Sequence, residues 1–436
     1  MADRVSTREL LALAIPSAAF VVLTNGYRLV DQYFIQGVST AAQAAIGSSI
    51  FVLLLFFAGA ELVAAGVGPL VARATGAGDL DLRRRLIGAG FFAATLVAAL
   101  IALIGGLGAD LIAVALGLEG DTARECASYL AALSFTMLPF ALTPALDQAF
   151  VSMGSARAPL VLHALSLGLN VILTPWFIFD LGLSTAGAAL AANLTRGIAT
   201  AIGVVVIARD TGLRWSDVRP AGQLGRIFRV GAPMALGTVA YSLVYWAMLK
   251  TSISPLGPHV NAALGIGFSA LEGFTWPCFH GVSLAVASLV GRALGAKRPD
   301  LAKDAVRRGF PLVSALGVAA TLAFWLGGRP LTALFTEDPL VHEAAIGYAV
   351  ALAASQLFVS WEALFEGVLA GAGDTRTVFW LSVPFNVLRI PLAWWFAFPL
   401  GFGAVGVWWA INLTSYAKTI AKAWATRRGR WVHIEI

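Results

Sequence analysis

The sequence predicts an all-helical integral membrane protein in which twelve transmembrane helices form two parallel six-helix lobes. Three observations support this fold class: an apolar composition, a one-sided distribution of basic residues and an internal repeat. Of the 436 residues, 58% are hydrophobic and only 12% are charged. Soluble domains contain about 25% charged residues, so most of this chain is expected to face lipid or other apolar helices.

Apolar windows of membrane-spanning length recur along the whole chain, since a bilayer core requires about 20 such residues per helix. The predicted spans occupy residues 9–33, 43–72, 87–116, 127–151, 159–180, 186–208, 230–252, 261–290, 309–328, 343–369, 378–399 and 400–417. The basic start before the first apolar run resembles a signal peptide, but the run continues through Asp31 into further spans. We therefore interpret it as the first transmembrane helix.

Basic residues indicate how these helices are oriented. Of the thirty Lys and Arg residues, twenty-four lie in the amino terminus, in the loops after even-numbered spans, or in the carboxyl terminus from Lys418 to Arg430. Cytoplasmic segments carry the excess of Lys and Arg, so we expect a multi-pass inner-membrane protein with both termini in the cytoplasm. The net charge of +6 has the same origin and does not indicate nucleic-acid binding.

An internal repeat divides the chain into halves. A shift of 219 residues superposes LVARATGAGDLDL on LVGRALGAKRPDL, GSAR on GDTR and ANLT on INLT, and three matches at one offset indicate duplication. Each half holds six spans, so both halves have the same orientation and are expected to enclose a central cleft. The predicted parts are an amino-terminal lobe over residues 1–208, a cytoplasmic linker over 209–228 and a carboxyl-terminal lobe over 229–436 with a basic cytoplasmic tail.

Ionisable residues inside spans are the main candidates for function, because each costs about 3 kcal/mol near the membrane centre. The alternative is that they form neutralising pairs that fasten helices together. Under the repeat shift, Asp147 falls on Glu366 and Asp31 on Lys250, which favours acids facing the shared cleft. The candidates for that cleft are Arg28, Glu61, Lys250, Glu272, His280, Glu362, Glu366 and Arg389.

A carboxylate carries a proton or binds sodium when it is partly desolvated beside hydroxyl or amide oxygens. Asn170 and Thr174 lie four residues apart on the fifth span and supply such oxygens on one helix face. His163 and His280 are candidate proton relays, although lone histidines in spans more often only form hydrogen bonds.

Several functional classes are disfavoured. The two cysteines fit neither a disulfide framework nor a zinc spacing, and the sequence has no metalloprotease or nucleophile motif that would indicate an enzyme. A channel is disfavoured because no filter-like motif accompanies the duplicated lobes. We expect no cofactor, no bound metal apart from a coupling sodium ion at Asp31, and a monomer whose partners are a small-molecule substrate and the bilayer.

Five motifs give the chain a resemblance to the multidrug and toxic compound extrusion (MATE) family. The segment VDQYFIQG from Val30 is similar to that family's first helix, and the two repeated LV-x-R-A-x-G-A segments are similar to the ends of helices two and eight. LAGAGDTR and NVLRIPLAWW resemble helices ten and eleven. The resemblance covers essentially the whole chain and implies a rocker-switch antiporter that exports cationic or amphipathic compounds against inward sodium or protons.

The resemblance also implies a cation site in the amino-terminal lobe, similar to that of the prokaryotic DinF-like branch. Asp31 and Asn170 match that pattern. Thr174 stands where the family has an Asp, and Ala192 replaces a Thr beside Asn193. Asp147 lies near the position of a family Asn, so the second carboxylate is expected to have moved to Asp147.

Two alternatives remain at this point. Asp147 is either the relocated coupling acid or the structural partner of Arg196 or another cation of the lobe. The chain is either an exporter of small compounds or a flippase for a lipid-linked precursor, which would need a basic cleft such as Arg28, Arg196, Lys250 and Arg389 would provide. The motif match favours export.

Overall fold

The computed structural model describes residues 4–219 and 222–436, and helices make up its regular structure. Internal contacts divide the chain into two compact units. One unit, here the N-terminal unit, is Phe20–Ala235; the other, the C-terminal unit, is Leu236–Ile436 together with the residues up to Ala19. All the bonds described below lie within one unit or the other.

Eight helices run from the start of the described chain to the linker. They are α1 (Thr7–Ile35), α2 (Thr40–Ala77), α3 (Leu80–Ile101), α4 (Ala109–Ala115), α5 (Gly120–Phe135), α6 (Leu138–Ser152), α7 (Arg157–Pro175) and α8 (Ser184–Thr211). Short π-helical turns extend α3 and α7. The turn between α2 and α3 follows from its sequence: Gly78 takes the left-handed conformation that ends α2, and the Asp79 side chain caps α3.

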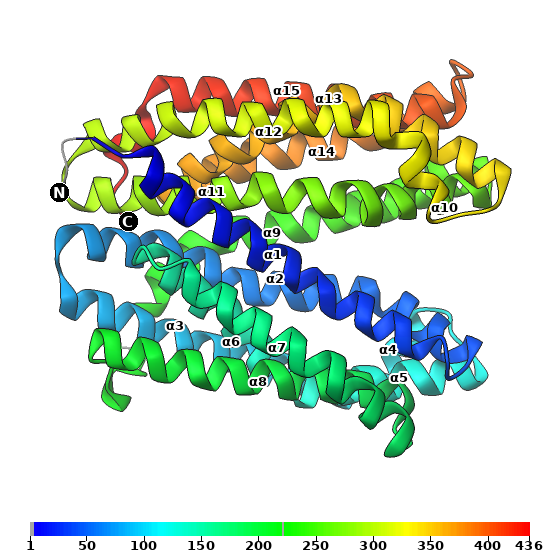
Figure 1. Ribbon diagram of the computed structural model, residues 1–436, viewed down its shortest axis with the longest axis horizontal. Coiled ribbons are helices and arrows are strands. Elements are labelled where there is room, and N and C mark those ends of the chain that lie inside the picture. The colour runs from blue at the N-terminus through cyan, green and yellow to red at the C-terminus, as the bar shows by residue number, and fades with distance from the viewer. Residues whose placement is uncertain (1–3, 220–221) are drawn as a thin grey trace. The chain divides into compact units, whose positions relative to one another are not determined.

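Seven helices follow the linker. They are α9 (Leu224–Met248), α10 (Pro258–Ile266), α11 (Gly273–Gly295), α12 (Pro299–Ala333), α13 (Pro339–Gly371), α14 (Thr375–Ala397) and α15 (Gly403–Arg428). Within the C-terminal unit, α13 packs against α11, α12 and α15, and α14 packs against α15 (Figure 1).

Each of the twelve predicted spans has a helical counterpart among the described residues, which confirms the all-helical fold class. Nine helices of the described chain are long and apolar enough to cross a membrane on their own. The pair α5 and α6 passes the same test as one span that bends by 52°. The eleventh and twelfth predicted spans correspond to α14 and α15, whose buried charges lower their hydropathy.

Two helices begin in one unit and end in the other. The start of α1 is held in the C-terminal unit, where the Val5 amide donates to Asp304 at 2.9 Å and Glu9 pairs with Arg292 at 3.3 Å. The start of α9 lies in the N-terminal unit, where a Cβ atom on Gly66 would lie 2.2 Å from the Ile227 carbonyl oxygen. Such a close approach of two helices requires glycine.

The linker is anchored to its own unit. Arg84 of α3 pairs with Asp217 at 2.9 Å, and a Cβ atom on Gly88 would lie 2.2 Å from the Asp217 carbonyl oxygen. Residues 220–221 of the predicted linker lie outside the described residues. Because α8 continues to Thr211 and α9 begins at Leu224, the connection is shorter than the sequence indicated.

The basic carboxyl-terminal segment is more ordered and more buried than the sequence predicts. Lys418 and Lys422 were assigned to a cytoplasmic tail, whereas α15 continues through Arg428 and buries both side chains, with relative exposures of 7% and 0%. The positive-inside count treated each lysine as solvated. Acidic partners on α13 make their burial feasible, as described below.

Candidate functional site

A buried polar stripe runs along α7. His163, Ser166, Asn170 and Thr174 are spaced by three or four residues, so they share one face of the helix, and all four are at most 5% exposed. The opposite face carries exposed apolar residues such as Val161 and Ile172. In a membrane helix this pattern turns the polar groups toward the protein interior, where hydrogen-bond partners are available.

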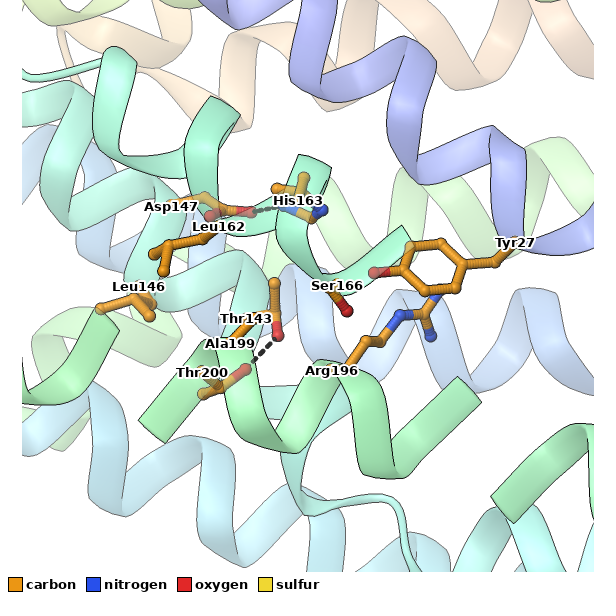
Figure 2. Close-up of a pocket in the computed structure, with 10 residues that line it drawn as sticks. All are labelled: Tyr27, Thr143, Leu146, Asp147, Leu162, His163, Ser166, Arg196, Ala199 and Thr200. Carbon is orange, nitrogen blue, oxygen red and sulfur yellow. Dashed lines mark hydrogen bonds and ion pairs between the residues drawn. The ribbon is translucent and has the colours of Figure 1, made fainter. Parts of the chain in front are cut away.

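The stripe borders a small pocket enclosed by α1, α6, α7 and α8, drawn in Figure 2. Its volume is about 10 Å³, which is roughly the space that one water molecule requires. The pocket is lined by Tyr27, Thr143, Leu146, Asp147, Leu162, His163, Ser166, Arg196, Ala199 and Thr200.

Asp147 pairs with His163 at this pocket. The His163 Nε2 atom lies 2.8 Å from the Asp147 Oδ2 atom, and the His163 ring stacks on Phe20 with centroids 5.5 Å apart. The alternative that Asp147 is held by Arg196 is therefore replaced by a carboxylate–imidazole pair. Arg196 instead lies over the Tyr27 ring, 4.1 Å from its centroid (Figure 2). A carboxylate bonded to an imidazole is suited to holding and passing a proton.

Asp31 lies one helical turn beyond Tyr27 on α1 and is only 7% exposed. Its Oδ1 atom is buried and has no hydrogen-bond partner among the described residues. Arg196 is the positive charge that acts on it electrostatically. A buried carboxylate oxygen without a donor is costly, so a bound proton or cation at Asp31 would remove that cost.

Asn170 and Asn193 place two further acceptor oxygens in the same unit. Asn170 donates through Nδ2 to the Thr174 hydroxyl at 2.9 Å, and Asn193 donates to the Leu133 carbonyl at 3.0 Å and the Thr136 hydroxyl at 2.8 Å. The Oδ1 atoms of both asparagines are buried without partners among the described residues. The bonds to Asn193 form at the break between α5 and α6, where a carbonyl and a hydroxyl are free to accept them.

The acids of the C-terminal unit are matched by lysines. Lys418 lies 2.9 Å from Glu362, and Lys422 lies 2.9 Å from Glu362 and 2.5 Å from Glu366. Both pairs of residues are four apart on their helices, so the two acids of α13 face the two lysines of α15. This cluster follows the structural alternative in which intramembrane charges fasten helices together.

Arg389 and Glu272 lie elsewhere in the C-terminal unit. Arg389 is 2% exposed, and its guanidinium donates to the hydroxyls of Thr414, Tyr245 and Ser415 at 3.0, 3.2 and 3.4 Å. Glu272 accepts a hydrogen bond from the Tyr348 hydroxyl at 2.7 Å. Both side chains are thus held by neutral hydroxyl groups.

The other predicted cleft residues are more exposed to solvent or lipid than Arg389. Arg28 and Lys250 are exposed, and the Lys250 ammonium lies 5.5 Å from the centroid of Trp246. Glu61 is half-buried on α2. His280 is half-buried and stacks on Trp276, with ring centroids 5.6 Å apart.

Sequence reasoning missed Tyr27, Thr143, Ser166 and Thr200, which line the pocket. Ser166 had a usable signal, because it lies between His163 and Asn170 at helical spacing. Thr143 and Thr200 bond to each other at 2.8 Å across α6 and α8, and no pattern within one helix indicates such a contact.

A sequence model described as MatE matches residues 16–176 and again residues 233–395. The chain belongs to the MatE family. The double match agrees with the internal repeat, and the family makes this protein a multi-pass membrane transporter. As a MatE member, the chain is similar to the probable multidrug resistance protein NorM of Thermotoga maritima, with 25% identity covering 97% of this chain and 93% of that protein. It is also similar to the multidrug export protein MepA of Staphylococcus aureus, with 23% identity covering 93% and 90%.

Solved structures share the fold of this MatE chain. A multidrug resistance MATE family transporter of the MOP superfamily in an outward-facing conformation matches with a TM-score of 0.90 and 20% identity, covering 98% of this chain and 96% of the other. The MATE transporter VcmN of Vibrio cholerae in its bent form matches with a TM-score of 0.88 and 21% identity, covering 98% and 97%.

Proposed function

We propose that this MatE protein exports small organic compounds, cationic or amphipathic, in exchange for protons or sodium ions that enter through the N-terminal unit. The observation that carries the proposal is that Asp31 and Asn170 of this unit keep buried acceptor oxygens without donors among the described residues; Asn193 has such an oxygen too, as does its counterpart Asn412 in the C-terminal unit. Oxygen atoms of carboxylate and amide groups are the ligands that hard monovalent cations prefer, and a proton on Asp31 would satisfy the same demand.

The relatives support export as the direction and drugs as the substrate class. NorM and MepA are named as multidrug resistance and multidrug export proteins. Their names favour export of small compounds over the transfer of a lipid-linked precursor. Asp147 and His163 are proposed as the second element of coupling, because their bond places a titratable pair beside the polar stripe of α7.

The proposed cycle is alternating access by a rocker-switch motion. Binding of the cation at Asp31 and binding of the drug favour different states, so each ligand shifts the population toward the state that it binds more tightly.

The protein is proposed to act as a monomer in the inner membrane with cytoplasmic termini. Single cysteines at Ser39 and Thr122 should then be labelled from outside, and one at Ser216 only after permeabilisation; the reverse pattern would exclude this topology.

Transport in proteoliposomes with independently imposed sodium and pH gradients tests the proposal. Purified protein should move a fluorescent cationic dye against the dye's own concentration gradient when one of the two ion gradients is imposed. An ionophore that collapses that ion gradient should abolish this movement. Dye movement that ignores both gradients would overturn the proposed coupling.

A further inference from the structure

The two halves of the chain keep the same local bonds at matched positions. Under the shift of 219 residues, Asn193 corresponds to Asn412 and Thr195 to Thr414. Each asparagine donates to a backbone carbonyl of a neighbouring helix, at 3.0 Å on α5 and 2.6 Å on α13. Each threonine bonds to the carbonyl four residues earlier, at 2.9 Å in both halves. The shift therefore pairs structurally equivalent positions.

Charge differs at the positions that surround the pocket. Three lining residues of the N-terminal unit have charged counterparts in the C-terminal unit. The matched pairs are Thr143 with Glu362, Asp147 with Glu366, and Ala199 with Lys418. At these three positions the first repeat has one acid, whereas the second has two acids and a lysine. The first repeat has its own cation at the pocket, Arg196, whose counterpart is the neutral Ser415.

A second lysine completes the difference. Lys422 corresponds to Gly203. A Cβ atom added to Gly203 would lie 2.6 Å from the Leu146 side chain and 2.7 Å from the Leu162 side chain, so these two leucines cover the glycine. In the C-terminal unit the Lys422 ammonium is fully buried and touches both carboxylates, at 2.9 Å on Glu362 and 2.5 Å on Glu366. Asp147, the counterpart of Glu366, has a neutralisable imidazole as its partner instead.

Arg389 shows the same difference in charge between matched positions on α14 and α7. It corresponds to Asn170, whose Oδ1 atom has no donor among the described residues. The Arg389 guanidinium is surrounded by hydroxyl oxygens of Tyr245, Thr414 and Ser415, as a bound cation would be. At this position the C-terminal unit has a cationic side chain where the first repeat leaves an acceptor oxygen open.

We propose that Lys418 and Lys422 are tethered counter-cations that permanently fill the C-terminal counterpart of the Asp147 pocket, so that the exchangeable coupling cation binds only in the N-terminal unit. The covalent stem of each lysine prevents its ammonium from leaving with the transport cycle. The C-terminal cluster is thus a latent site for primary ammonium ions, closed by the chain itself. The coupling half of this inference rests on the proposed function; the latent site does not.

Chemical rescue tests the latent site without any transport measurement. Lys422→Ala removes the ammonium from Glu366 and leaves a cavity shaped for a butyl chain. The thermal unfolding midpoint of the purified variant should rise by roughly 2–4 °C with millimolar butylammonium, because a ligand that binds only the folded state stabilises it. Tetramethylammonium at equal ionic strength should have no effect, since it lacks N–H donors.

Two proteins serve as controls for that experiment. The parent protein and Lys303→Ala, which removes an exposed lysine of α12, should not respond to butylammonium. If Lys422→Ala does not fold, Lys418→Ala gives a second test: Lys422 still pairs with both acids and supports folding, while Glu362 and the Asn386 Oδ1 atom lose the ammonium that butylammonium would replace. An equal response to both ammonium ions, or an equal response in the parent, would overturn the latent site.

A neutral double variant tests the confinement of coupling. Lys422→Met with Glu366→Gln removes one positive and one negative charge and leaves Lys418 paired with Glu362. Buried ion pairs are often replaced without loss of stability, so the variant should fold, should not respond to butylammonium and should keep the parent's dependence of export on the imposed ion gradient. Loss of that dependence in a folded variant would overturn the inference. Absence of coupled export in the parent would instead overturn the proposed function.

Discussion

The two repeats of this transporter have the same fold but treat buried charge in opposite ways. In the N-terminal unit, Asp31 and Asn170 each keep a buried oxygen without a donor among the described residues, whereas the open oxygen of Asn193 is shared by its counterpart Asn412. In the C-terminal unit, Glu362 and Glu366 are bonded by two lysines of the same chain. A satisfied ion pair stabilises one arrangement, whereas an open acceptor gains stability only when a cation or proton arrives. The contrast supports the proposal that the first repeat is the one that responds to the coupling cation.

The largest effect is expected at Asp31. Asp31→Asn removes the charge but keeps the shape, so gradient-driven export should be abolished while the protein stays folded and inserted. Dye efflux in proteoliposomes measures it, with Asp110→Asn, an exposed acid of α4, as the matched control. Undiminished concentrative export by a folded Asp31→Asn protein would show that the open carboxylate of the first repeat has no role in coupling.

Asp147 sharpens the comparison because its counterpart Glu366 already holds a lysine. Asp147→Asn should abolish coupled transport, and adding Thr174→Asp should restore much of it by returning an acid to α7. Glu366→Gln should leave the dependence on the ion gradient unchanged. A double variant that stays inactive while folded, or a harmless Asp147→Asn, would make Asp147 structural.

Arg389 is expected to matter for stability more than for coupling. Arg389→Met deprives the buried hydroxyls of Thr414 and Ser415 and that of half-buried Tyr245 of a charged donor, and each such bond contributes about 1.5–3 kcal/mol. The free energy of unfolding should therefore fall by roughly 3 kcal/mol or more, measured by denaturant or thermal unfolding in detergent. Arg389→Lys should recover part of the loss, and an equal loss in both variants would show that packing rather than charge is responsible.

The smallest effects are expected at the matched asparagines. Asn193→Ala and Asn412→Ala each remove buried hydrogen bonds and should cost about 1–2 kcal/mol of unfolding free energy. Both asparagines keep a buried Oδ1 atom without a donor among the described residues, but only Asn193 lies in the unit of Asp31 and Asn170. Only Asn193→Ala should therefore also weaken the response of export to the imposed ion gradient. Equal responses in transport would mean that the open oxygen of Asn193 has no role distinct from that of Asn412.

The fold was predictable because membrane spans and a duplication can both be recognised from short stretches of sequence. Twelve apolar windows and three matched motifs needed no knowledge of contacts between distant residues, and each window has a helical counterpart. The positive-inside pattern was less reliable at single residues. It placed Lys418 and Lys422 in solvent, because a count of basic residues does not contain the acids of α13 that pair with them.

The site was predictable only in part. Asp147, Asn170 and Thr174 were identified from their residue types and spacing. The partner of Asp147 was not, since Arg196 and His163 were equally available in sequence and only the packing of α6 against α7 and α8 distinguishes them. Tyr27 and Thr143 carry no charge, so the insertion cost that identified the acids gave no signal for them.

The crossing of α1 and α9 between the units has a consequence for any attempt to divide the protein. A polypeptide that ends at Arg219 lacks Ile227, whose carbonyl packs against Gly66 of α2. The remaining fragment lacks Val5 and Ala18, which bond to Asp304 and pack against Gly281. Neither fragment holds a whole unit, so each would expose a groove that only the other can fill. Two such fragments, expressed together, should reassemble by mutual exchange of a helical segment, whereas either one produced alone should be degraded.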